Sequence, residues 1–153
     1  MKVKFPFHFK DLKIKLHRYP CMGTCPCYDV TLYGTGEVIY NGGYFVKEVG
    51  ERRDEVNSFE LLELFKYAVE VGFFEMQDNY EFRTFISFDE DLLINEHGDT
   101  LTDQPSCQVT IDTGKQSKSV LNYLGAPKRL ITFENKIEKL ANTKRWVKEF
   151  RQT

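Results

Sequence analysis

The stretch "DLKIKLHRYPCMGTCPCYDVTLY" (residues 11–33) decides the fold of this chain, because it holds two alternating segments joined by a cysteine-rich loop. Apolar and polar residues alternate strictly over residues 11–18, and residues 27–33 repeat the pattern. This alternation is typical of strands that bury one face. The inward positions are Leu12, Ile14 and Leu16 in the first segment and Tyr28, Val30 and Leu32 in the second. If the two strands pair, the loop between them lies at one end of a sheet.

Further strands are predicted on both sides of a central helix. Residues 37–40 ("EVIY") and 44–49 ("YFVKEV") are predicted as two further strands, and Asn41-Gly42 between them favours a tight hairpin turn. Later in the chain, residues 107–112 and 117–123 flank a turn at Thr113-Gly114. These connections are short enough for antiparallel hairpins.

Two helices complete the predicted core. Asn57 is a suitable N-cap for a helix that ends before Gly72, and Pro127 opens a second helix that runs to about Ala141. The core face of the second helix comprises Leu130, Phe133, Ile137, Leu140 and Ala141, and a short terminal helix presents Trp146, Val147 and Phe150. We predict an α+β fold, with a largely antiparallel sheet and helices packed on one face. Residues 1–153 form a single domain in this interpretation, with an irregular, insertion-like excursion at about 73–101.

Composition narrows the classes of function. The chain has 153 residues, a net charge of −2 and a pI near 6.0, so no nucleic-acid partner is expected. No stretch reaches the roughly 18 apolar residues of a membrane span, and the N-terminus lacks the apolar core of a signal peptide. We therefore expect a cytoplasmic protein without a membrane partner. Thiols in the cytoplasm are normally reduced.

Cys21, Cys25 and Cys27 crowd into seven residues and raise the question of a metal site. Structural zinc usually needs four ligands arranged as two Cys/His pairs, and no second pair exists here. Cys107 shares its predicted strand face with Val109 and Ile111, so we expect a buried, inert thiol. These three clustered cysteines are therefore weak metal candidates, and no cofactor is expected.

The same loop also permits redox chemistry. Gly23 allows a tight reversal and Pro26 fixes the backbone before the second strand, which brings Cys21 and Cys25 within bridging distance. Cys27 shares its strand face with polar residues and is expected on the solvent side, outside the pair. The alternative interpretation is a β-connection whose sulfurs only fill space.

Several of these pieces together resemble the domain-of-unknown-function family number 6438. The resemblance covers about residues 12–150, and its most specific part is an arginine followed by C-x-G-x-C-P-x-Y. The matching positions are Arg18, Cys21, Gly23, Cys25, Pro26, Tyr28, Val38, Tyr40, Gly42, Thr102, Asp103, Pro105, Tyr123 to Pro127, Arg145 and Trp146. Cys27, Cys107 and residues 81–101 are additions to the pattern. The resemblance implies the fold and transfers no activity.

We therefore expect a non-enzymatic binding or interaction module, whose partner is a protein or a small-molecule ligand. Its candidate surface lies around residues 21–27 and the Asp103–Pro105 loop, with Cys21, Gly23, Cys25, Pro26, Tyr28 and Asp103 as candidate site residues. The alternative is a thiol-based redox or metal-binding protein that uses the cysteine loop. A hydrolase or transferase would have Asp103 as its acid or base and is the third hypothesis.

Overall fold

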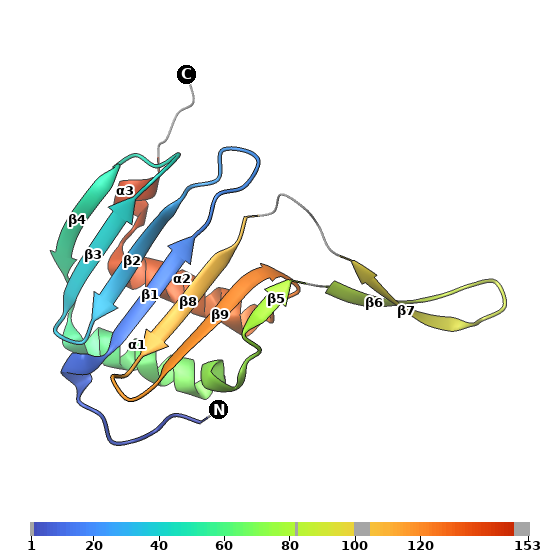
Figure 1. Cartoon of the computed structure of the whole chain (residues 1–153), viewed down its shortest axis with the longest axis horizontal. Helices are drawn as coiled ribbons and strands as arrows, with labels where there is room; N and C mark the ends of the chain where they lie inside the picture. Colours follow the sequence, from blue (N-terminus) through green and yellow to red (C-terminus); the bar gives the residue numbers. More distant parts are fainter. Residues whose placement is uncertain (1, 82, 100–104, 149–153) are drawn as a thin grey trace.

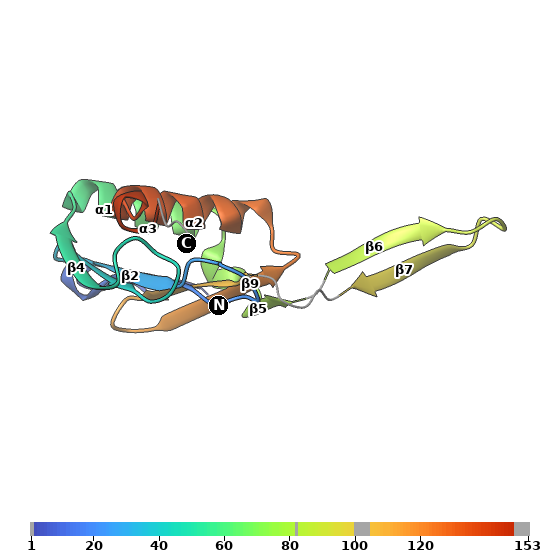
Figure 2. The ribbon, with the colours of Figure 1, turned by 90° about the horizontal axis from the view of Figure 1, so that it is seen from above.

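The computed structural model describes residues 2–81, 83–99 and 105–148. It has a twisted seven-stranded sheet, a layer of helices, and a two-stranded hairpin that projects away from both (Figure 1). The view from above shows that the helices cover one face of the sheet only (Figure 2). The α+β class and the largely antiparallel sheet are thus confirmed.

The strands in chain order are β1 (Lys13–Arg18), β2 (Tyr28–Tyr33), β3 (Glu37–Gly42), β4 (Gly50–Glu55), β5 (Asn79–Glu81), β6 (Arg83–Phe88), β7 (Ile94–Asp99), β8 (Cys107–Asp112) and β9 (Ser117–Leu124). The helices are α1 (Ser58–Glu70), α2 (Lys128–Ala141) and α3 (Lys144–Val147), with short 3-10 turns η1 (Phe9–Asp11) and η2 (Phe73–Glu75).

The main sheet has the strand order β4-β3-β2-β1-β8-β9-β5, so β1 lies at its centre. All neighbouring pairs are antiparallel except β5 and β9, which are parallel. β1 and β2 pair as neighbours, with Leu16 opposite Val30. The cysteine loop therefore lies at one end of the sheet, as expected from the two alternating segments.

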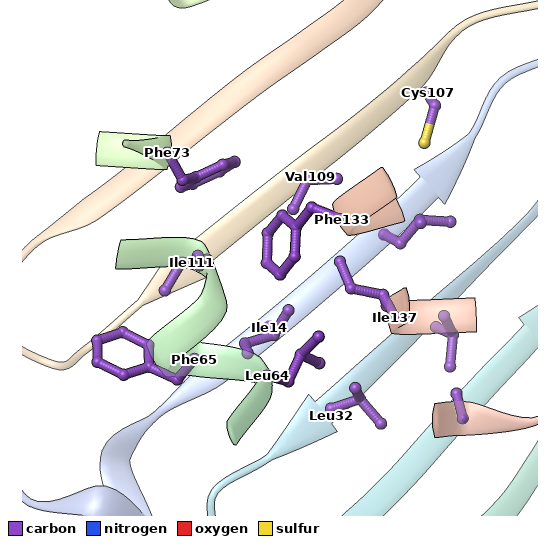
Figure 3. Packing of buried hydrophobic residues seen from close by; sticks show 14 of the residues in the cluster. Ile14, Leu32, Leu64, Phe65, Phe73, Cys107, Val109, Ile111, Phe133 and Ile137 are labelled. Atoms are coloured by element: carbon purple, nitrogen blue, oxygen red, sulfur yellow. The ribbon is translucent and has the colours of Figure 1, made fainter. Parts of the chain in front are cut away.

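The core lies between the sheet and the helices α1 and α2 (Figure 3). Apolar side chains of both layers meet there and are fully or almost fully buried: Ile14, Leu32, Leu64, Phe65, Phe73, Val109, Ile111, Phe133 and Ile137. Cys107 joins this cluster and is buried, as its strand phase predicts. Leu140 is only partly buried and packs at the margin.

The ends of α1 follow the predicted signals. The side chain of Asn57 accepts a hydrogen bond from the Phe59 amide at 2.7 Å, and Gly72 adopts a left-handed backbone at φ 74°. Leu61, Leu64, Phe65 and Ala68 form the buried face of α1, whereas Val69 is 37% exposed. Phe150, expected on the terminal helix, lies outside the described residues.

The predicted strand at residues 44–49 is wrong. β3 continues through Gly42, which pairs with Gly50, so the fourth strand begins only at residue 50. Residues 43–49 form a folded connection in which the Tyr40 hydroxyl donates to the Glu48 carbonyl at 2.9 Å. A Cβ at Gly42 would lie 2.0 Å from that same carbonyl oxygen. Gly42 is therefore needed because the backbone of Glu48 approaches it closely, and not because of the tight turn that the Asn-Gly pair predicts.

The segment at about 73–101 is more regular than expected. It contains η2, the edge strand β5, and the hairpin of β6 and β7. β6 and β7 form a two-stranded sheet separate from the main one. Figures 1 and 2 both show this hairpin extending beyond the edge of the main sheet. Aromatic and acidic residues obscure its alternation in the sequence.

Candidate functional site

Four side chains form a row across the sheet next to the cysteine loop. Arg18 on β1 is the cross-strand partner of Tyr28 on β2 and of Cys107 on β8, and Cys107 is in turn the partner of Asn122 on β9. Residues at the same level of neighbouring strands share one face of the sheet. Here that face is the one covered by α2, so the row is polar but lies under a helix.

Two carboxylates of α2 meet this row. Glu138 accepts hydrogen bonds from the guanidinium of Arg18 and the hydroxyl of Tyr28. One helical turn earlier, Glu134 accepts from the side-chain amide of Asn122 at 3.0 Å. In the described part of the chain no buried side-chain nitrogen or oxygen lacks a hydrogen-bond partner. The helix and the sheet are therefore joined by a satisfied polar network.

Burial shifts the titration of this network. It raises the pKa of the Glu134 carboxyl, which is only 3% exposed, although Asn122 and Arg18 oppose the shift. Burial, and then the Glu138 carboxylate, raises the pKa of Tyr28 above its ordinary value. Burial likewise raises the pKa of the Cys107 thiol. Tyr28 and Cys107 are therefore protonated near neutral pH, and Tyr28 is a hydrogen-bond donor.

The cysteine loop contains a disulfide. Cys21 and Cys25 are bonded, with their Cα atoms 5.7 Å apart, inside the range that a bridge requires. The amide of Gly23 donates to Cys21 Sγ at 3.3 Å, which supports the tight reversal predicted for this glycine. Both cysteines are partly exposed. The predicted pair is therefore close enough to bridge, as expected.

Cys27 does not lie on the solvent side, and that prediction is corrected. It is only 7% exposed, and its thiol donates to the Cys25 carbonyl oxygen at 3.2 Å. β2 begins at Tyr28, so the strand alternation does not reach back to residue 27. The connection after β3 also covers it, since the Cys27 amide donates to the Tyr44 carbonyl at 2.9 Å. Cys27 remains outside the disulfide, as expected.

A pocket of about 290 Å³ opens between the cysteine loop and the start of β8. Its lining combines Arg18 and Tyr28 of the row, and Glu138 of α2, with apolar groups from four segments of the chain. The lining residues are Arg18, Tyr19, Cys25, Pro26, Tyr28, Pro105, Ser106, Glu138 and Val147. The Tyr19 amide donates to the Ser106 carbonyl at 3.0 Å, which ties the two loops together beside the pocket.

The predicted site residues are distributed unevenly around this pocket. Cys25, Pro26 and Tyr28 line it, whereas Cys21 and Gly23 belong to the loop but not to the lining. Asp103 lies outside the described residues. Glu134 and Glu138 were not among the site residues predicted from the sequence. Glu134 could have been predicted, because it falls on the core stripe of α2, between Leu130 and Ile137, where a carboxylate needs a buried polar partner.

The described residues hold no cluster of three or more His, Cys, Asp or Glu side chains suited to a metal. In the disulfide form, Cys21 and Cys25 are committed to each other and cannot serve as thiolate ligands beside Cys27. Among the same residues, no helix is both long and apolar enough to cross a bilayer.

The fold and the site define a class of protein: an α+β domain whose central strands carry a C-x-G-x-C-P-x-Y loop above an Arg–Tyr–Glu cluster. The model of the family described as "Domain of unknown function (DUF6438)" matches residues 12–141. The chain belongs to this family. The similarity at Arg145 and Trp146 lies beyond the matched residues. No curated protein matches the chain.

Proposed function

We propose that this domain is a non-enzymatic binding module that holds its ligand in the pocket beside the cysteine loop. The observation that carries the proposal is the composition of this pocket, in which Tyr19, Pro26, Pro105 and Val147 offer apolar surface. The polar side chains of Arg18, Tyr28, Ser106 and Glu138 lie next to it. Sites for small ligands are typically apolar with a few polar groups that fix orientation.

The polar side chains suggest which ligand fits. Arg18 carries five N–H donors, whereas the single hydroxyl proton of Tyr28 is already donated to Glu138. Glu138 occupies one side of the guanidinium. A compact apolar molecule or side chain that also carries a carboxylate or carbonyl acceptor would match the remaining donors of Arg18.

Two small probes that differ in one group test this proposal. Benzoate and benzyl alcohol have the same ring, but only benzoate carries a carboxylate. In amide-resolved NMR spectra we expect saturable shifts at Tyr19, Cys25 and Ser106, with benzoate binding more tightly. Ser106→Phe should fill the pocket and remove the shifts. Ser117→Phe, at the far end of β9, is the matched control and should leave them unchanged. Absence of saturable shifts, or shifts that survive Ser106→Phe, would contradict the proposal.

A thiol–disulfide function is the second candidate, and the bonded pair Cys21–Cys25 favours it. Cys25 lines the same pocket as Arg18, so one cysteine of the bond borders the pocket. In such exchange, a thiolate of a dithiol donor attacks one sulfur of the bond. The donor is oxidised to a disulfide. Cys21 and Cys25 are reduced to two thiols, which carry the two protons that the donor lost.

Equilibration with glutathione redox buffers separates a structural bond from an exchanging one. A reduction potential above about −300 mV, together with reduction of an external disulfide substrate, supports the redox function. A potential below about −300 mV identifies the bond as structural. Binding of benzoate is measured independently in the oxidised protein, so the two proposals can fail separately.

A further inference from the structure

The projecting hairpin of β6 and β7, which we call the arm, has one apolar face that nothing in the described residues covers. Ile86, Phe88 and Ile94 share this face, because Phe88 and Ile94 are cross-strand partners and Ile86 lies two residues before Phe88. Glu96, the cross-strand partner of Ile86, lies on the same face and is the one carboxylate among them. These three side chains are 72–75% exposed. The opposite face carries the polar cross-strand pair of Ser87 and Asn95. Such alternation is typical of a hairpin that is buried on one side.

The tip of the arm extends this apolar surface and is itself ordered. Leu92 and Leu93 are 74% and 60% exposed. Asp89 accepts hydrogen bonds from the amides of Asp91 at 2.9 Å and Leu93 at 3.0 Å, which holds the turn in shape. The arm therefore presents a defined surface. Monomeric proteins rarely leave an apolar patch of this extent uncovered unless it binds something.

Charge indicates what the arm binds. Residues 86–98 contain four carboxylates and no lysine or arginine, which gives the arm −4. The whole chain carries −2, so the rest of it carries +2. Two arms repel each other, whereas an arm and the body of another copy attract. An anionic membrane or nucleic acid would repel the arm.

The helical layer offers a complementary surface. A groove of about 380 Å³ between α1 and α2 is lined by Leu64, Tyr67 and Leu140, with Lys136 and Lys139 beside Glu60 and Glu63. Lys139 also borders a second hollow, of about 450 Å³, at the junction of α2 and α3. Lys144 and Lys148 line that hollow. Three lysines and one carboxylate, Glu138, line this hollow, so its charge is positive. The neighbouring Lys144 lowers the pKa of Lys148.

We propose that the chain forms a two-fold dimer in which the arm of each copy docks on the helical layer of the other, with its apolar face in the α1–α2 groove and its acidic tip near the lysines. The five apolar side chains of one arm expose roughly 300–400 Å². Two exchanged arms and the surfaces that they cover then bury roughly 1,200–1,600 Å², which matches a stable interface. A closed two-fold exchange satisfies both arms at once and leaves no arm free.

Sedimentation velocity on the full chain, from about 5 to about 200 μM, tests the assembly. We expect a dimer of twice the 18.0 kDa chain mass. Ile86→Ser combined with Ile94→Ser should give a monomer with an unchanged circular dichroism spectrum. Ser87→Ala combined with Asn95→Ala, on the other face of the same arm, is the matched control and should remain dimeric. A monomeric wild-type chain, or a dimer that survives the Ile86/Ile94 change, overturns the proposal.

Charge reversal then distinguishes docking on the body from pairing between arms. Lys139→Glu with Lys144→Glu reverses the charge of the helical surface on which the arm docks. Glu90→Lys with Asp91→Lys reverses the charge of the arm tip. Each double variant alone should dimerise at least tenfold more weakly. An equal mixture should recover the dimer, because both interfaces of the mixed pair are again complementary. A body-reversed variant that dimerises like the wild type would show that the arms pair with each other, which overturns the proposal.

Discussion

The hydroxyl of Tyr28, at the first position of β2, donates a hydrogen bond to Oε2 of Glu138, which lies 110 residues later on α2. The cross-strand partner of Tyr28, Arg18, donates to the other oxygen of the same carboxylate. One side chain of the helix therefore fixes both the arginine that precedes the C-x-G-x-C-P-x-Y motif and the tyrosine that ends it. The pocket lies directly beside this junction, so its polar groups are set by contacts between distant parts of the chain.

Glu138→Gln should lower the free energy of unfolding by about 1–3 kcal/mol, because it leaves the partly buried Arg18 without an anionic partner. Guanidinium denaturation at neutral pH measures the change. Glu63→Gln is the matched control on α1, where the carboxylate contacts Lys66 in a largely exposed pair at 3.4 Å. The control should change stability by less than about 0.5 kcal/mol. Equal small effects of both changes would show that the junction adds no stability.

Phe133→Ala should cost about 3–5 kcal/mol, because this ring is fully buried between α2, η2 and the sheet. Ile131→Ala, two residues earlier and 43% exposed, should cost less than about 1 kcal/mol. Chemical denaturation of both variants with a common m-value gives the comparison. A loss below about 1 kcal/mol for Phe133→Ala would contradict the face assigned to α2.

The strands that bury one face were predictable because alternation has a direct physical cause, and Leu12, Ile14 and Leu16 are fully buried as expected. Local patterns failed where distant segments decide the outcome. Gly42 was predicted in a turn, but the connection after β3 folds back against it. Cys27 was predicted on the solvent side, but the same connection covers it. Glu138 carries no local signal of its own, since its partners lie on β1 and β2.

The stability of Glu134→Gln relative to the wild type should rise with pH. Burial raises the pKa of Glu134 above its ordinary value of 4.5 in the folded state. A carboxyl group shifted in this direction contributes stability that is fully present below pH 4.5 and is lost as the pH rises through the folded-state pKa. The glutamine variant has no such loss. Unfolding of both proteins between about pH 4 and about pH 8 should therefore show a difference that moves in favour of the variant. A constant difference, or one that moves the other way, would show that the folded state does not raise this pKa.

Cys107 should resist thiol reagents in the native protein. It is buried, and burial raises its pKa, so little thiolate is present and little surface is accessible. After mild reduction, Cys21 and Cys25 should react first, because both are partly exposed. Mass spectrometry of timed alkylation identifies each site, and the denatured protein provides the fully reactive control. Rapid labelling of Cys107 in the native protein would show that its side chain lies on the solvent-exposed face of β8, which contradicts the prediction.

Removal of the disulfide should have a modest effect on stability because the loop that it closes is short. Cys21 and Cys25 are four residues apart, and the entropy that a cross-link removes from an unfolded chain grows with loop length. For about five residues this model gives about 2 kcal/mol. Cys21→Ser combined with Cys25→Ser should lower the free energy of unfolding by that amount under non-reducing conditions. Addition of a dithiol reductant should bring the wild type to the level of the variant and leave the variant unchanged. A loss above about 4 kcal/mol would exceed the effect of chain entropy, and would show that the bond also holds Pro26 and Tyr28 in place at the junction with Glu138.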